Sequence, residues 1–235
     1  MTTLIIARHG NTFTSDQTPT RVGARTDLPL VESGQEQARK IGAWLKENNI
    51  YPEIVYSSEL QRTKQTAQIA IETLGYKQPI FPLSIFNEID YGPDENQPED
   101  KVIARIGEQA IKDWDAHATV PNGWQFNPDE CIENWKNFAA QHTASPSSFG
   151  ATEGSHSTAR DTAIQSQYDG LGDLGDVEEI ILVVTSNGIA RFAPHLTGNF
   201  EEFARNHKIK LSTGALGILK FEDEKWVITG WDVRP

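Results

Sequence analysis

The chain of 235 residues is 37% hydrophobic and 23% charged, and its formal net charge is −12 at pH 7. This length suits one domain with a sizeable core, and so acidic a surface argues against nucleic acids and anionic membranes as partners. The single cysteine, Cys131, excludes an intrachain disulfide and a metal site built from cysteines.

Predicted strands and helices alternate along the first 90 residues. Apolar residues recur at helical spacing from Val31 onward, which predicts a first helix. Ser58 is a suitable N-cap for a second helix, which Gly75 would end. Short apolar runs predict strands over residues 3–8, 53–57 and 79–86.

The middle of the chain contains the longest segment without apolar periodicity. An acidic loop precedes two helical patterns, at residues 99–117 and 129–142. Residues 143–176 are rich in Ser, Thr, Gly and Asp, and a loop of this length is uncommon inside a compact domain. We therefore interpret residues 143–176 as an insertion or a mobile loop.

The strongest predicted strand follows this polar segment. The unbroken apolar run at residues 179–185 indicates a central strand that is buried on both faces. A helix over residues 187–196 and a β-hairpin of residues 215–221 and 225–231 are predicted after it. Because strands alternate with helices, we expect a single α/β domain over residues 1–235 with a mainly parallel sheet.

Polar side chains follow four of the predicted strands at the point where each strand ends. Parallel strands bring their carboxyl ends to one edge of the sheet, which is where ligands bind in open α/β folds. The groups are Arg8-His9, Ser57-Ser58 with Arg62 one helical turn further on, Asn87-Glu88 and Ser186-Asn187. Together they would supply a candidate nucleophile, two guanidiniums, a carboxylate and a helix N-terminus.

Five blocks of this sequence, in order, resemble the histidine phosphatase superfamily, which includes the cofactor-dependent phosphoglycerate mutases. The blocks are Arg8-His9-Gly10-Asn11-Thr12; Thr26-Asp27-Leu28-Pro29-Leu30 with Gly34 and Gln37-Ala38 after it; Val55-Tyr56-Ser57-Ser58-Glu59-Leu60-Gln61-Arg62-Thr63; Asn87-Glu88-Ile89-Asp90-Tyr91-Gly92; and Val183-Val184-Thr185-Ser186-Asn187-Gly188 with Arg191 beyond it. Five ordered blocks are far more specific than any one of them, although the likeness is thin over residues 100–178. The resemblance implies a three-layer α/β/α fold like that of the phosphoglycerate mutases.

The resemblance also implies a phosphohistidine mechanism. His9 would attack phosphorus through an unprotonated ring nitrogen, and Glu88 would protonate the leaving oxygen, with Asp90 as a competing carboxylate. No metal and no other cofactor is expected. The phosphate-binding residues that the resemblance implies are Arg8, Asn11, Arg62, Ser186 and Asn187.

One position departs from the family pattern, because Ser186 stands where the family has a second histidine. A serine hydroxyl carries no positive charge, and loss of one such donor costs on the order of 3 kcal/mol of transition-state stabilisation. Three functions therefore remain open. The leading one is a metal-independent phosphatase that hydrolyses a small phosphomonoester. The alternatives are a catalytically weak protein that binds a phosphate ligand or regulates, and a phosphotransferase of the phosphoglycerate mutase type.

Location and partners follow from what the sequence lacks. No basic run followed by a long apolar segment occurs at the start, and no apolar run approaches the roughly 20 residues that span a bilayer. We therefore expect a cytoplasmic protein whose partner is a small phosphorylated substrate. The identity of that substrate and the oligomeric state stay open.

Overall fold

The structure is a computed structural model, and it describes residues 1–143 and 179–235. The predicted polar insertion at residues 143–176 lies outside the described residues except for Thr143.

A six-stranded mixed sheet forms the centre of the molecule. Its strands lie in the order β3-β2-β4-β1-β5-β6. The first four strands of that order run parallel, and β5 and β6 run antiparallel to their neighbours. The strands are β1 (Thr2–Arg8), β2 (Ile54–Ser57), β3 (Ile80–Pro82), β4 (Glu179–Thr185), β5 (Leu216–Glu222) and β6 (Lys225–Val233). The predicted mainly parallel sheet is thus confirmed.

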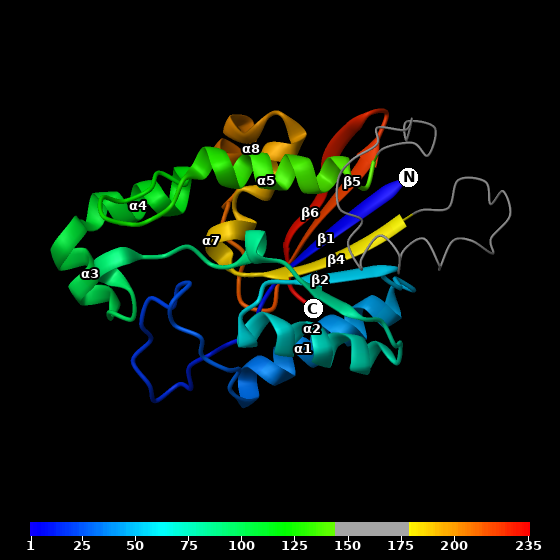
Figure 1. Cartoon of the computed structure of the whole chain (residues 1–235), viewed down its shortest axis with the longest axis horizontal. Helices are drawn as coiled ribbons and strands as arrows, with labels where there is room; N and C mark the ends of the chain where they lie inside the picture. The colour runs from blue at the N-terminus through cyan, green and yellow to red at the C-terminus, as the bar shows by residue number, and fades with distance from the viewer. Residues whose placement is uncertain (144–178) are drawn as a thin grey trace, which may run out of the picture.

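Helices cover both faces of the sheet. Figure 1 shows α1 and α2 on one side, and α5, α7 and α8 on the other, with α3 and α4 extending beyond the sheet. The helices are α1 (Glu32–Glu47), α2 (Gln61–Leu74), α3 (Glu99–Ile106), α4 (Glu108–His117), α5 (Pro128–Ala140), α7 (Asn187–Ala190) and α8 (Phe200–Asn206). Short 3-10 helices lie at η1 (Ser84–Phe86), η2 (Gly92–Asp94) and η4 (Ala193–Thr197). This is the three-layer α/β/α arrangement that the sequence predicted.

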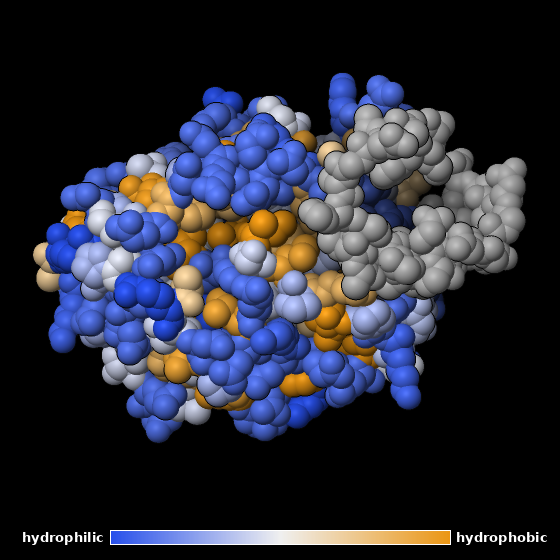
Figure 2. Space-filling view, in the orientation of Figure 1, coloured by the Kyte–Doolittle hydropathy of each residue, from blue (hydrophilic) through white to orange (hydrophobic). Residues whose placement is uncertain are grey.

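Strand β4 is buried on both faces, as its unbroken apolar run predicted. Ile181 and Val183 belong to the apolar cluster beneath α5, whereas Leu182 and Val184 belong to the cluster beneath α1 and α2. Successive side chains of a strand point to opposite faces, so one run of residues contributes to both cores. Figure 2 shows one face of the molecule, on which most residues are hydrophilic and apolar residues are exposed between them.

The predicted N-cap at Ser58 is wrong. Helix α2 begins at Gln61, and its cap position is Leu60. The Ser58 hydroxyl accepts from the Leu60 amide at 3.2 Å and lies 2.6 Å from the Thr63 hydroxyl. Ser58 therefore stabilises the turn that leads into the helix. The predicted end at Gly75 is confirmed, because Gly75 is in the left-handed conformation with φ of 79°.

Three other predicted elements are shorter than expected. Residues 99–117 form two helices that are separated at Gly107. Only Ile80–Pro82 of the predicted third strand pairs in the sheet. The helix predicted over residues 187–196 ends at Ala190, since Pro194 has no N–H group to continue the hydrogen-bond ladder.

The parallel ladder continues past the strand ends and aligns the loops that follow. The His9 amide donates to the Thr185 carbonyl at 3.0 Å, and the Ser58 amide donates to the Val184 carbonyl at 3.1 Å. Residues 9, 58 and 186 therefore leave the sheet at one edge. Within the described residues, the structure holds no helix whose length and apolar character would let it cross a bilayer.

Candidate active site

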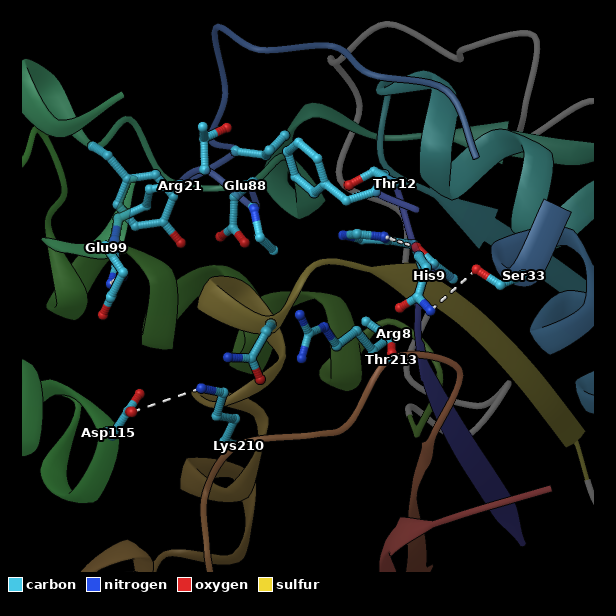
Figure 3. Close-up of a pocket in the computed structure, with 18 of the residues that line it drawn as sticks. Arg8, His9, Thr12, Arg21, Ser33, Glu88, Glu99, Asp115, Lys210 and Thr213 are labelled. Atoms are coloured by element: carbon cyan, nitrogen blue, oxygen red, sulfur yellow. Dashed lines mark hydrogen bonds and ion pairs between the residues drawn. The ribbon is translucent and has the colours of Figure 1, made fainter. Parts of the chain in front are cut away.

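A cavity of about 630 Å³ opens at this edge of the sheet. Four of the predicted site residues line it close to the sheet, namely Arg8, His9, Glu88 and Asn187, and Asn11 lines it as well. Figure 3 shows His9, Arg8 and Thr213 coming from neighbouring segments, with Glu88 across the cavity from them. A volume of this size accommodates a small ligand considerably larger than a phosphoryl group.

The hydrogen bonds of the His9 imidazole determine which of its nitrogens carries the proton. Nδ1 lies 2.7 Å from the Gly10 carbonyl oxygen, which only accepts, so Nδ1 carries the proton. Nε2 accepts a hydrogen bond of 3.2 Å from Nε of Arg62. The Nε2 lone pair is therefore the nucleophilic group of this ring.

Burial and positive charge keep the His9 imidazole neutral. Its side chain is buried, and burial lowers the pKa of His9 well below its usual value. The neighbouring guanidiniums of Arg62 and Arg8 lower that pKa further. A neutral imidazole between two cations is suited to attack on an anionic phosphoryl group.

Arg8 and Arg62 occupy different positions relative to the cavity. Arg8 lines it, and its Nη1 donates to the Leu211 carbonyl at 2.6 Å. Arg62 is fully buried and does not line the cavity. Its Nη1 and Nη2 donate to the backbone carbonyls of Thr26 and Gly23, so Nε is its group nearest the reactive nitrogen.

Glu88 is held in place by two backbone amides. It is only 6% exposed, and its carboxylate accepts from the Ile89 amide at 3.0 Å and from the Gly188 amide at 3.2 Å. A Cβ on Gly188 would lie 2.0 Å from Oε1 of Glu88, so only glycine leaves room for the carboxylate here. The competing carboxylate, Asp90, does not line this cavity and instead pairs with Arg25.

The two asparagines differ in which of their polar atoms are already bonded. Oδ1 of Asn187 accepts from the Leu211 amide at 3.0 Å, which leaves its Nδ2 as a possible donor to a ligand. Nδ2 of Asn11 donates to the Ser33 hydroxyl at 3.4 Å, near the upper limit of a hydrogen bond.

Ser186 lies behind the cavity wall. It is fully buried, it does not line the cavity, and its hydroxyl has no hydrogen-bond partner among the described residues. Of the predicted phosphate-binding residues, Arg62 and Ser186 are thus the two that the open cavity does not reach.

Several charged residues of the cavity were not predicted to belong to the site. Arg191 lines it and is 1% exposed, its Nη1 donates to the Trp114 carbonyl at 2.6 Å, and its guanidinium lies 3.9 Å from the centre of the Trp114 ring. Burial lowers the pKa of Arg191 to about 10. The others are Arg21, Glu99, Asp115 and Lys210. None of these residues follows the end of a predicted strand directly, so their proximity in the fold identifies them.

Comparisons with known proteins agree with this geometry. The sequence profile of the histidine phosphatase superfamily (branch 1) matches residues 4–148. The chain belongs to the histidine phosphatase superfamily. Similar relatives include a 2,3-bisphosphoglycerate-dependent phosphoglycerate mutase of Tropheryma whipplei, 30% identical over 48% of this chain and 51% of the relative. Another is the uncharacterized phosphatase PhoE of Bacillus subtilis, 37% identical over 42% of this chain and 48% of the relative.

A solved structure shares the fold over its whole length. The mycobacterial glucosyl-3-phosphoglycerate phosphatase aligns with a TM-score of 0.71 and 17% identity, covering 99% of each chain. The alignments with the curated relatives, by contrast, span about half of the length of those proteins. Both phosphatases and mutases thus occur among the superfamily members that this chain resembles.

Proposed function

We propose that this member of the superfamily is a metal-independent phosphatase that hydrolyses a small phosphomonoester through a phosphohistidine at His9. One observation carries the proposal: the neutral His9 imidazole and the Glu88 carboxylate line one cavity, with Arg8 beside them. Nucleophile, proton donor and anion-binding cation are the three groups that this chemistry needs.

The first step forms the phosphoenzyme. The Nε2 lone pair of His9 attacks phosphorus while the bond from phosphorus to the ester oxygen breaks, and Glu88 gives its proton to that departing oxygen. Arg8 offsets the charge on the phosphoryl oxygens, and Nε of Arg62 is placed to do the same once it leaves Nε2. In the second step water attacks phosphorus, the bond from phosphorus to Nε2 breaks, and the ionised Glu88 accepts the water proton.

The test is to trap the phosphoenzyme. Rapid acid-free quenching of the protein with a ³²P-labelled phosphomonoester should leave acid-labile label on the chain, and His9→Ala should abolish it. His117→Ala changes an exposed histidine at the end of α4 and is the matched control, which should label normally. No label and no turnover over a broad panel of phosphomonoesters would disprove the proposal.

A catalytically weak phosphate-binding or regulatory protein is the second candidate. It is favoured by Ser186, whose buried hydroxyl has no partner among the described residues where the family has a second histidine. Under this alternative Ser186→His should raise turnover by about two orders of magnitude, the converse of removing one preorganised donor. Little change would indicate that the existing site is already competent.

A further inference from the structure

The cavity has a second group of charged residues at the end away from His9. We call Arg21, Glu99, Asp115 and Lys210 the outer wall; all four line the cavity. Figure 3 shows these side chains at one end of the cavity, with Arg8 and His9 toward the other. Nothing in the phosphoryl-transfer chemistry described above uses them.

Each cation of the outer wall is already paired with a carboxylate. Arg21 Nη2 lies 2.5 Å from Oε2 of Glu99, and Lys210 Nζ lies 3.6 Å from Oδ2 of Asp115. Asp115 also lies 3.9 Å from Nη2 of Arg191. The outer wall therefore presents two positive and two negative groups, and its formal charge is balanced.

Arg21 is a fixed part of this wall. Its side chain is 13% exposed, and its guanidinium lies 5.4 Å from the Tyr91 ring centre and 5.0 Å from that of Trp124. Its Nε is buried and has no hydrogen-bond partner among the residues that the structure describes. Contacts with two aromatic rings and Glu99 limit how far this guanidinium can turn toward an added anion.

The inner end, unlike the outer wall, carries more positive than negative groups. Arg8 and Arg62 adjoin His9, and Arg191 lines the same cavity, whereas Glu88 is the carboxylate that faces them. This excess of positive charge complements a phosphoryl group. The charge selectivity of the two ends therefore differs: the inner end attracts an anion, and the outer wall does not.

From this contrast we infer that the substrate's leaving group is a neutral, hydroxyl-rich alcohol, such as a polyol or a sugar, and that Glu99 and Asp115 select against leaving groups with a carboxylate or a second phosphate. The inference rests on the proposed phosphatase function. A hydroxyl both donates and accepts, so it can donate to the carboxylates of the wall and accept from Arg21 without separating either ion pair. An anionic group would meet like charge and would have to compete with Glu99 and Asp115 for their cations.

Matched substrates test the selection directly. Glycerol 3-phosphate and 3-phosphoglycerate differ only in CH2OH against a carboxylate, as do glucitol 6-phosphate and 6-phosphogluconate. We expect kcat/KM to favour the neutral member of each pair by at least about tenfold, which equals roughly 1.4 kcal/mol. Equal rates, or preference for the acids, would overturn the inference. So would a clear preference for phosphoethanolamine, because the wall would then select a cation.

Variants assign the selection to the two carboxylates. The double change Glu99→Gln and Asp115→Asn keeps the side-chain shapes, and it should reduce the preference at least fivefold, mainly through a lower KM for the acidic substrates. Glu108→Gln is the matched control, because Glu108 is an exposed α4 residue 3.6 Å from Lys112 that does not line the cavity. This change should leave the ratio of kcat/KM between the neutral and acidic substrates unchanged. An unchanged ratio in the double variant would refute the assignment.

Phosphohistidine trapping in the same assays separates the two possible failures. If no substrate labels His9, the phosphatase proposal fails and the inference falls with it. If both members of each pair label His9 equally well, only the inference fails.

Discussion

Nε of Arg62 donates a hydrogen bond of 3.2 Å to Nε2 of His9, the nitrogen that would attack phosphorus. The arginine is fully buried, and its other two nitrogens are bound to backbone carbonyls. This contact has two consequences. It fixes the orientation of the ring by occupying the Nε2 lone pair, and the adjacent positive charge opposes protonation of that lone pair. Attack on phosphorus requires Nε of Arg62 to exchange Nε2 for a phosphoryl oxygen.

Removal of the Arg62 charge should therefore raise the pKa of His9. In Arg62→Gln the imidazole should titrate closer to the ordinary histidine range, and in Arg62→Lys the rise should be smaller because the charge is retained. Phosphoenzyme formation in Arg62→Gln should slow by about 10²-fold, the cost of one preorganised donor. An NMR titration of the His9 ring nitrogens, with quenched-flow labelling, measures both. Titration of His9 at the same pH in wild type and Arg62→Gln would contradict this account.

Gly188→Ala should impair the proposed proton donor without changing any ionisable group. The new Cβ would lie 2.0 Å from Oε1 of Glu88, so the carboxylate must move from its two amide donors. General acid catalysis typically contributes 10²–10⁴-fold, and we expect kcat to fall by about 10²-fold. In a Glu88→Gln background the same change should cost less than about threefold, because residues that act as a unit are not additive. Full additivity of the two losses would show that Gly188 acts elsewhere.

The sheet was predictable because its central strands are buried apolar runs with clear ends. The prediction for β4 at residues 179–185 matches its bounds, and that for β1 differs by one residue. Helix ends were predicted less well where a polar side chain could form its hydrogen bond either as a helix cap or in the preceding turn. Serine is a common N-cap residue, but the Ser58 hydroxyl accepts a hydrogen bond in the turn before the helix. Only the packing of the loop decides whether such a hydroxyl caps the helix or stabilises the turn.

The sequence could predict only those residues of the candidate site that lie at or just after the ends of strands. Arg8, His9 and Glu88 come together because parallel strands, or the loops after them, end at one edge. The outer wall lies on α3, α4 and two loops, whose packing no local pattern encodes. Glu99 and Asp115 have the sequence pattern of solvated helix charges, and their position beside the cavity emerges only from the packing of the helices.

Stability should decrease as the pH falls from about 6.5 toward 4, in part through His195. Its ring stacks 3.8 Å from Phe200 and 6.0 Å from Phe192, and burial lowers its pKa from 6.5 to about 4. Over this interval the unfolded chain binds a proton at this position that the folded protein does not, so unfolding becomes easier. Since the ring is partly exposed, we expect a contribution of only about 1 kcal/mol.

His195→Phe is the test, because it keeps a flat ring between the two phenylalanines and removes the titration. Urea unfolding of wild type and variant from pH 7 to 4.5 should show a smaller loss of unfolding free energy in the variant. The buried His9 adds a fall of the same sign to both proteins. Curves that stay parallel across this range would rule out His195 as a source of the pH dependence.

Ser186→Ala separates a structural role of the buried hydroxyl from a role in binding phosphate. The hydroxyl bonds to none of the described residues, so its removal should change the unfolding free energy by less than about 1 kcal/mol. Thr185→Val is the matched control at the next residue: its hydroxyl donates to the Phe86 carbonyl at 2.8 Å, and its loss should cost about 1–2 kcal/mol. If Ser186 binds a phosphoryl oxygen, as the sequence resemblance implied, Ser186→Ala should lower kcat about tenfold although it is the more stable of the two variants. Unchanged kcat in Ser186→Ala would remove Ser186 from the phosphate site and leave Arg8, Asn11, Arg62 and Asn187 as its candidate donors.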